Sequence, residues 1–286
     1  MTVSHIFTVD VEEYFHVLAF QETIKIADWN QWPSRAEAGV DRLLELLSER
    51  GHCGTFFVVG WLAERQPSLV RRIADAGHEI ASHTWWHRPV YQTTPDEFRE
   101  DVGRTRALLQ DLTGQPVYGF RAPSFSIGPD TPWAFDILIE EGHRYDSSVF
   151  PIRRPDYGDP SAPTVPYMIE RPGGALLELP LATTVIAGLR LPAAGGGYFR
   201  QLPYALTRRA FQALGRAGQS GVFYIHPWEL DPDQPRVAAP FLSRVRHYRG
   251  LEKTVPRLER LVTEFRFTSA AQRYGITEEW VPAMPT

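Results

Sequence analysis

Apolar and polar positions alternate along roughly the first 150 residues in a way that predicts short strands separated by amphipathic helices. Short apolar runs indicate buried strands, whereas apolar residues three and four positions apart indicate one face of a helix. Such alternation predicts parallel βα units, and their number favours a barrel over an open sheet. The predicted strands are 6–9, 55–59, 79–82, 117–120, 144–146, 175–179, 222–225 and 267–270, and the predicted helices are 40–47, 67–76, 95–112, 130–141, 205–216 and 251–265.

The second half of the chain departs from this pattern in two places. Residues 151–172 are rich in proline and predict a long surface excursion without regular structure. Glycines 195–197 predict a flexible turn that could serve as a lid. No internal repeat or low-complexity linker interrupts the chain, so we expect one domain over residues 1–286.

Composition narrows the class of protein. The net charge is −4, and no cluster of lysine and arginine suggests a nucleic-acid partner. The single cysteine, Cys53, excludes an internal disulfide framework. The N-terminus has no basic segment followed by an apolar stretch, and no apolar run is long enough for a membrane span. We therefore expect a cytoplasmic protein without a membrane span.

Two carboxylates follow the first predicted strand. Asp10 and Glu12 are two residues apart, so they point to the same side of the strand, and Glu13 points to the other side. Barrel enzymes place their chemistry at the carboxyl ends of their strands. Acidic residues in such places are more often solvated caps, so this pair alone is a weak signal.

A pair of histidines follows the third predicted strand. The spacing of His83 and His87 would bring both imidazoles to one face of a helical turn, where they could bind one metal. Thr84 replaces the glutamate that metalloproteases of the HExxH type need. Two histidines and one carboxylate suit zinc hydrolases and non-haem iron oxygenases, but the oxygenases are usually all-β barrels. The βα pattern therefore favours hydrolysis.

Three further strand ends carry polar groups. Arg121 ends the fourth predicted strand, Asp146 the fifth, and His226 the strand at 222–225. Each residue alone could be a surface ion pair, a cap or a core histidine. A series of successive strand ends with ionisable groups indicates an active site.

These segments carry a family resemblance. TVDVE, HTWWH, RAP, DSS and IHP, in this order over about residues 5–230, resemble the five motifs of the polysaccharide deacetylase (NodB-homology) family. The resemblance implies an α/β fold, a distorted (β/α)7 barrel, here with a C-terminal extension. TVDVEEYFHV, GGGYFRQLPY and the segment after His226 resemble a subfamily that accompanies exosortase and exopolysaccharide loci, and residues 227–286 would be its specific C-terminal region.

The resemblance also implies roles for residues. Asp10 would be the general base, and Glu12, His83 and His87 would hold a divalent metal, with Zn²⁺ the default. Arg121 would orient the base, and His226 would be the general acid with Asp146 as its partner. A backbone N–H near Ser124 could stabilise an oxyanion. Substrate contacts would come from Trp85, Trp86 and Trp228.

The function that follows is removal of N-acetyl groups from amino sugars of an exopolysaccharide or its precursor. In most of the family the metal carboxylate directly follows the base, whereas here Val11 intervenes, as in a branch with allantoinase-like enzymes. A cyclic imide or ureide amidohydrolase is therefore an alternative, and a non-catalytic glycan-binding subunit is another. The partner would be a carbohydrate, and residues 151–172 with the C-terminal region could support a homo-oligomer.

Overall fold

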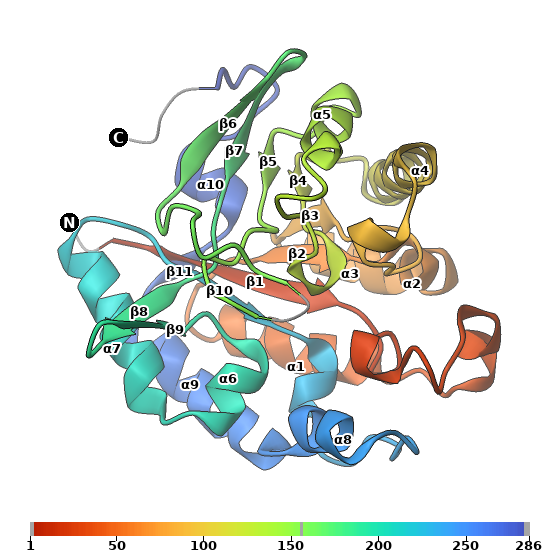
Figure 1. Cartoon of the computed structure of the whole chain (residues 1–286). Coiled ribbons are helices and arrows are strands. Elements are labelled where there is room, and N and C mark those ends of the chain that lie inside the picture. The colour runs from red at the N-terminus through yellow and green to blue at the C-terminus, as the bar shows by residue number, and fades with distance from the viewer. Residues whose placement is uncertain (1–2, 155–156, 283–286) are drawn as a thin grey trace.

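Seven parallel strands form the centre of the molecule, and helices lie around them (Figure 1). The computed structural model describes residues 3–154 and 157–282. The parallel strands run in the spatial order β10-β1-β2-β3-β4-β5-β7. Their bounds are β1 (His5–Val11), β2 (Thr55–Val58), β3 (Glu79–Ser82), β4 (Gly119–Phe120), β5 (Tyr145–Asp146), β7 (Gly174–Glu178) and β10 (Val222–Ile225).

The chain beyond β7 brings the two edges of this sheet together. Leu181 forms a parallel bridge with Val222 of β10, and the Ala182 N–H donates to the Val222 carbonyl at 3.2 Å. All residues of β1, β2 and β10 are buried, as expected for parallel strands covered on both faces. The α/β fold with a parallel, barrel-like sheet is therefore confirmed, and its strands β4 and β5 are only two residues long.

Helices connect the strands and cover the outside of the barrel. Helix α4 has the predicted start, because Thr94 and Glu97 form a capping box, and it ends at Gly114 with a left-handed φ of 66°. The α-helices are α1 (Ala36–Ser48), α2 (Gly60–Arg65), α3 (Pro67–Asp75), α4 (Pro95–Thr113), α5 (Trp133–Glu140), α6 (Gly196–Gln201), α7 (Tyr204–Arg216), α8 (Phe241–Tyr248), α9 (Thr254–Glu264) and α10 (Ala270–Tyr274). The 3-10 helices are η1 (Leu18–Phe20), η2 (Ile26–Gln31), η3 (Val90–Gln92), η4 (Pro123–Phe125), η5 (Pro227–Leu230) and η6 (Leu251–Lys253). Among the described residues, no helix combines the length and apolar character needed to cross a membrane.

Among the described residues, four more strands add to this central series of seven. β6 (Tyr167–Arg171) pairs antiparallel with β7, and β8 (Thr183–Ile186) forms a hairpin with β9 (Leu189–Pro192). β11 (Phe267–Thr268) pairs parallel with the start of β1. The expectation of an irregular segment over 151–172 is therefore wrong for 167–171, because that part gains a ladder with β7. Residues 155–156 of the same expectation lie outside the described residues.

The glycines at 195–197 do not form a free turn. Gly195 makes a bridge to Tyr224 of β10, and a Cβ at this position would lie 1.8 Å from the Tyr224 carbonyl oxygen. Gly196 then begins α6. The prediction of a flexible turn or lid is wrong, because the glycines allow a close backbone approach.

A second close approach joins the two halves of the chain. Gly39 of α1 lies against Pro227, where a Cβ would be 2.3 Å from the Pro227 carbonyl oxygen. Helix α1 therefore supports the η5 turn directly behind His226.

Candidate metal centre and active site

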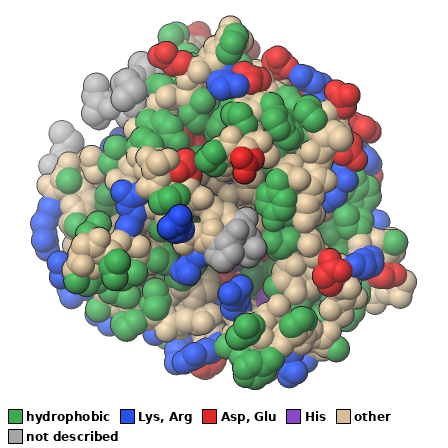
Figure 2. Space-filling view, viewed as in Figure 1, with side chains coloured by type: hydrophobic (Ala, Val, Ile, Leu, Met, Phe, Trp, Pro, Cys, Tyr) green, Lys and Arg blue, Asp and Glu red, His purple; other side chains and the backbone are tan. Residues whose placement is uncertain are grey.

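The ends of β1, β3, β4 and β10 bring five ionisable side chains together. Asp10, Glu12, His83 and Arg121 are almost fully buried, and His226 is the most accessible, with 18% of its side chain exposed. Figure 2 shows only a trace of histidine surface on this face of the molecule. His87 lies beside this group, and Glu12, His83 and His87 each offer one ligand atom, all within 4.8 Å of one another.

Backbone carbonyls determine which nitrogen of each histidine can bind a metal. His83 Nδ1 lies 2.8 Å from the Arg121 carbonyl, and His87 Nδ1 lies 3.0 Å from the His16 carbonyl. Because a carbonyl can only accept, both Nδ1 atoms carry the hydrogen and both Nε2 atoms keep a lone pair when the rings are neutral. The site therefore presents two Nε2 ligands.

The carboxylate of Glu12 completes a set that suits a cation. Glu12 Oε1 accepts from Trp228 Nε1 at 2.9 Å, whereas Oε2 is buried without a hydrogen-bond partner and lies 2.6 Å from His87 Nε2. With Nδ1 of His87 protonated, these are two acceptors facing each other, and a cation between them would satisfy both. The residues present therefore fit a divalent metal of the two-histidine, one-carboxylate kind.

The pKa values of Glu12 and His83 agree with a role as metal ligands. Burial acts most strongly on Glu12 and would raise its pKa, but His87, His226 and His83 together hold the pKa below its ordinary value. Burial lowers the pKa of His83 to about 4. At neutral pH the carboxylate is ionised and this imidazole is neutral, which are the forms that bind metals.

The loop that carries the histidines is not the helical turn that the sequence predicted. Residues 83–87 have no regular structure, and Thr84 and His87 have φ values of 59° and 49°, which a helix excludes. Asp101 of α4 instead accepts from the backbone N–H groups of Trp85 and Trp86. The rings of His83 and His87 still converge, with centroids 5.0 Å apart.

Backbone strain is concentrated around this site. Four of the five non-glycine residues with positive φ among the described residues are Thr84, His87, Ser124 and Phe125. Such strain is typical of functional sites.

Asp10 has neighbours different from those of Glu12. Arg121 Nη1 donates to Asp10 Oδ1 at 2.7 Å and to Thr8 Oγ1, and its other nitrogens bond Ser147. Asp10 Oδ2 lies 3.7 Å from His226 Nε2. Asp10 is thus held through one oxygen, while its other oxygen faces the histidine.

The predicted partner of His226 is wrong. Asp146 accepts from the Ser148 hydroxyl at 2.6 Å and shares a hydrogen bond with Glu178 of β7, so its carboxylate has other partners. His226 Nδ1 instead lies 2.7 Å from Glu229 Oε1, because the η5 turn brings Glu229 back over His226. Burial, the largest influence, would lower the pKa of His226, but Glu229, Glu12 and Asp10 raise it to about 9. The H-x-x-E spacing was the sequence signal for this pair.

Two of the three predicted substrate tryptophans cannot stack on a sugar. Trp85 is 3% exposed and packs in the core beneath the Arg104 guanidinium. Trp228 lies between the rings of His226 and His247, at 5.0 and 4.2 Å, so both of its faces are covered. Trp86 is half-buried and keeps that prediction open.

Comparisons with known proteins agree with this arrangement. The family model described as polysaccharide deacetylase matches residues 29–136, and a domain of unknown function (DUF3473) matches residues 147–274. The first of these segments is similar to the polysaccharide deacetylase family. The narrower subfamily tied to exosortase loci stays a prediction.

Curated relatives align with part of this chain. A peptidoglycan deacetylase-like protein of Gibberella zeae is 32% identical over 126 residues, which are 43% of this chain and 36% of that protein. The peptidoglycan-N-acetylglucosamine deacetylase of Bacillus cereus is 34% identical over 82 residues, 29% of this chain and 30% of that protein. The matches thus span about a third of these relatives' own lengths.

Solved structures share the fold of this protein over nearly the whole chain. A crystal structure from Mycobacterium smegmatis that carries the polysaccharide deacetylase name has a TM-score of 0.65 and 23% identity, covering 100% of this chain and 95% of that one. The Puue allantoinase has a TM-score of 0.62 and 19% identity, covering 97% and 92%. At these identities, the likeness concerns the fold alone.

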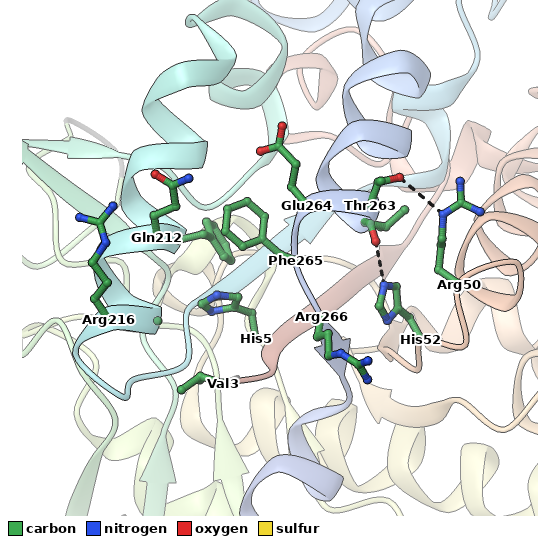
Figure 3. A pocket seen from close by; sticks show the side chains of 13 residues that line it. Val3, His5, Arg50, His52, Gln212, Arg216, Thr263, Glu264, Phe265 and Arg266 are labelled. Atoms are coloured by element: carbon green, nitrogen blue, oxygen red, sulfur yellow. Dashed lines mark hydrogen bonds between the residues drawn. The ribbon is translucent and has the colours of Figure 1, made fainter. Parts of the chain in front are cut away.

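A hollow of about 730 Å³ lies away from the candidate site (Figure 3). It is lined by His5 at the start of β1, so it lies at the opposite end of the barrel from Asp10 and Glu12. Figure 3 shows His5 and Phe265 towards its middle and Arg50 and Arg216 at its sides. Barrel enzymes place their chemistry at the other end, and this hollow has no cluster of metal ligands among the described residues.

Proposed function

We propose that this protein is a metal-dependent hydrolase that removes N-acetyl groups from amino sugars of a polysaccharide, with an exopolysaccharide or its precursor as substrate. One observation carries the proposal. The Asp10 carboxylate, which Arg121 holds, has its Oδ2 3.7 Å from Nε2 of the His226 imidazole. Both groups lie beside the set of Glu12, His83 and His87. A base and an acid beside a metal site are what hydrolysis of an amide requires.

Glu12, His83 and His87 would hold the metal, for which we propose zinc. When bound, a divalent cation would act as a Lewis acid towards water and towards the amide carbonyl. The two backbone carbonyls on the histidine Nδ1 atoms and the indole N–H on Glu12 would orient the three ligands.

Asp10 would accept the proton of the attacking water, and Arg121 would hold its carboxylate in place. Water adds to the carbonyl carbon, and a backbone N–H near Ser124 is our candidate for the oxyanion. His226 would then donate a proton from Nε2 to the amide nitrogen as the C–N bond breaks. Acetic acid, which ionises to acetate in water, and a free amine leave the site, and the proton taken by Asp10 replaces the one given by His226.

A neighbouring hollow could receive the rest of a glycan. It has a volume of about 390 Å³ and is lined by Phe125, Tyr157, Asp130 and Arg154, among others. Phe125 also contacts the Tyr224 ring at 5.0 Å, and Tyr224 lies beside His226. Aromatic surface with a few polar groups is typical of carbohydrate sites. This hollow favours a substrate larger than one acetamido group.

Ring opening of a cyclic imide or ureide is the second candidate. The observation that favours it is the Asp-x-Glu spacing, which places Val11 between the base and the metal carboxylate.

Two assays test both candidates: acetate release from N-acetylglucosamine oligomers and ring opening of hydantoin. Each is run with zinc, cobalt, nickel, iron or manganese added. We expect acetate release that a chelator abolishes and added metal restores. Ring opening without acetate release would favour the second candidate. Glycan binding without bound metal or turnover would instead indicate a non-catalytic subunit.

A further inference from the structure

We infer that Glu229, itself held by Arg200, is the positioning residue that aims the imidazole of His226 at the leaving nitrogen. The inference rests on the proposed function, because it assigns to His226 the role of general acid. The partner assigned to His226 is thus Glu229, three residues further along the same turn, and not the predicted Asp146 on another strand.

Glu229 binds His226 at two points. Its Oε1 accepts from His226 Nδ1 at 2.7 Å and from the His226 backbone N–H at 3.2 Å. The carboxylate is fully buried, so water does not compete for these bonds. With Nδ1 bound in this way, Nε2 of the ring points towards Asp10 Oδ2 and Glu12 Oε1, each 3.7 Å away.

Arg200 of α6 holds the other oxygen of Glu229. Its Nε donates to Glu229 Oε2, and its Nη1 donates to the carbonyls of His247 and Arg249 at 2.9 and 2.8 Å. The Arg200 side chain is 1% exposed. Burial would raise the pKa of Glu229, but Arg200 and His226 hold it below its ordinary value. A buried, fully bonded guanidinium therefore keeps this carboxylate ionised and immobile.

Trp228 fixes the plane of the same imidazole. Its indole is stacked on His226 with an angle of 19° between the rings, and its Nε1 donates to Glu12 Oε1. His247 covers the other face of the indole. The turn 226–229 thus supplies the acid, the ring that stacks on it and the carboxylate that aims it.

Substrates with different leaving groups can distinguish two roles for Glu229, orienting the general acid or only stabilising the structure. An amine needs a proton to leave, whereas a nitrophenolate leaves without one. Loss of aim should therefore slow hydrolysis of an N-acetyl amide and spare hydrolysis of 4-nitrophenyl acetate at the same site.

The test measures kcat and KM of the metal-loaded protein on an N-acetylglucosamine oligomer and on 4-nitrophenyl acetate. For Glu229→Gln we expect kcat on the amide to fall roughly 10- to 100-fold with little change in KM, and the ester rate to change less than about threefold. Glu229→Asp, which keeps the charge, should recover part of the amide rate. Glu264→Gln removes another arginine-bound carboxylate, near the opposite end of the barrel, and should change neither rate.

A double variant gives a second, independent readout. In the His226→Ala background, Glu229→Gln should have no further effect on the amide rate, because there is no imidazole left to aim. Equal losses on amide and ester, or additive effects in the double variant, would overturn the inference while leaving the proposed function intact. If Glu229→Gln does not fold, Glu229→Asp alone must show the selective loss on the amide, and an equal loss on both substrates would overturn it. A wild-type protein that hydrolyses the ester but releases no acetate from any amide would overturn the proposed function and this inference with it.

Discussion

Asp10 and Glu12 are two residues apart on β1, yet their carboxylates have different neighbours. Glu12 faces His83 and His87, whereas Asp10 is held by Arg121 and faces His226. The same alternation that places both side chains on one side of the strand thus separates the proposed metal ligand from the proposed base. Glu13, on the other side, binds the N–H groups of Arg35 and Ala36 at the start of α1.

This division predicts different results for two substitutions. Asp10→Asn should keep the metal and lower turnover roughly 10²- to 10⁴-fold, because a general base is lost. His83→Ala should lose both metal and turnover. Metal content by mass spectrometry and acetate release check this prediction, and equal metal loss in both variants would contradict the separation of roles.

The buried histidine His78 should make the free energy of unfolding depend on pH. His78 accepts from the Gly54 N–H at 3.1 Å, and burial lowers its pKa to about 4, against an ordinary value of 6.5. The unfolded chain therefore binds a proton between pH 6.5 and 4 that the folded protein does not bind. The stabilisation is present above pH 6.5 and is lost as the pH falls towards 4.

We therefore expect the free energy of unfolding of the wild type, relative to His78→Gln, to fall by about 1.4 kcal/mol per pH unit below 6.5. Urea unfolding at pH 7.5, 6 and 5 measures this difference. Because the two proteins share all other groups, a difference that is constant with pH would contradict the assignment.

At the scale of elements, local patterns predicted some segments better than others. The bounds of β3 and β10 agree with the prediction, and for β10 the reason is its continuous apolar run, which marks a parallel strand buried on both faces. The strands β6, β8 and β9 and the helices α2, α6, α8 and α10 do not follow from these patterns. The histidine spacing predicts a helical turn at 83–87, which is wrong because Asp101, on a later helix, determines the shape of this loop. The pairing of His226 was assigned to the wrong strand for a similar reason, because residue spacing alone does not show that Asp146 is already used by Ser148 and Glu178.

Helix α4 should accordingly control the histidine loop through Asp101. Burial raises the pKa of Asp101 to about 6, so its carboxylate is mainly ionised at neutral pH. Asp101→Ala would leave two backbone N–H groups without their acceptor and should cost about 1–3 kcal/mol. Thermal unfolding and metal titration should both show the loss, whereas Asp111→Ala, an exposed position on the same helix, should change neither. An unchanged metal affinity in Asp101→Ala would contradict the role of α4.

At the scale of the whole molecule, the C-terminal segment joins the barrel at its start. β11 pairs with His5 and Ile6, and the Phe267 ring packs between the rings of Phe7 and Phe223. Residues near the end of the chain are thus part of the same core as the first strand. The extension predicted for 227–286 contributes to the barrel rather than only lying beside it.

Truncation of Phe267 should therefore destabilise the whole fold. Phe267→Ala removes a ring that is 4% exposed and should cost about 3–5 kcal/mol in urea unfolding. Phe241→Ala, at a side chain that is 75% exposed, should cost less than about 0.5 kcal/mol. Similar small losses in both variants would contradict a structural role for β11.

The contact between Gly39 and Pro227 limits how this chain can recombine with its relatives. Gly39 falls within the match at 29–136 and Pro227 within the match at 147–274, so the contact joins two segments that are recognised separately. Glycine inside a helix costs about 1 kcal/mol relative to alanine, which the close approach explains. A chimera that takes the first segment from a donor with a larger residue at this position would push the turn bearing the imidazole away from the carboxylates. The two segments should therefore be exchangeable only as a matched pair.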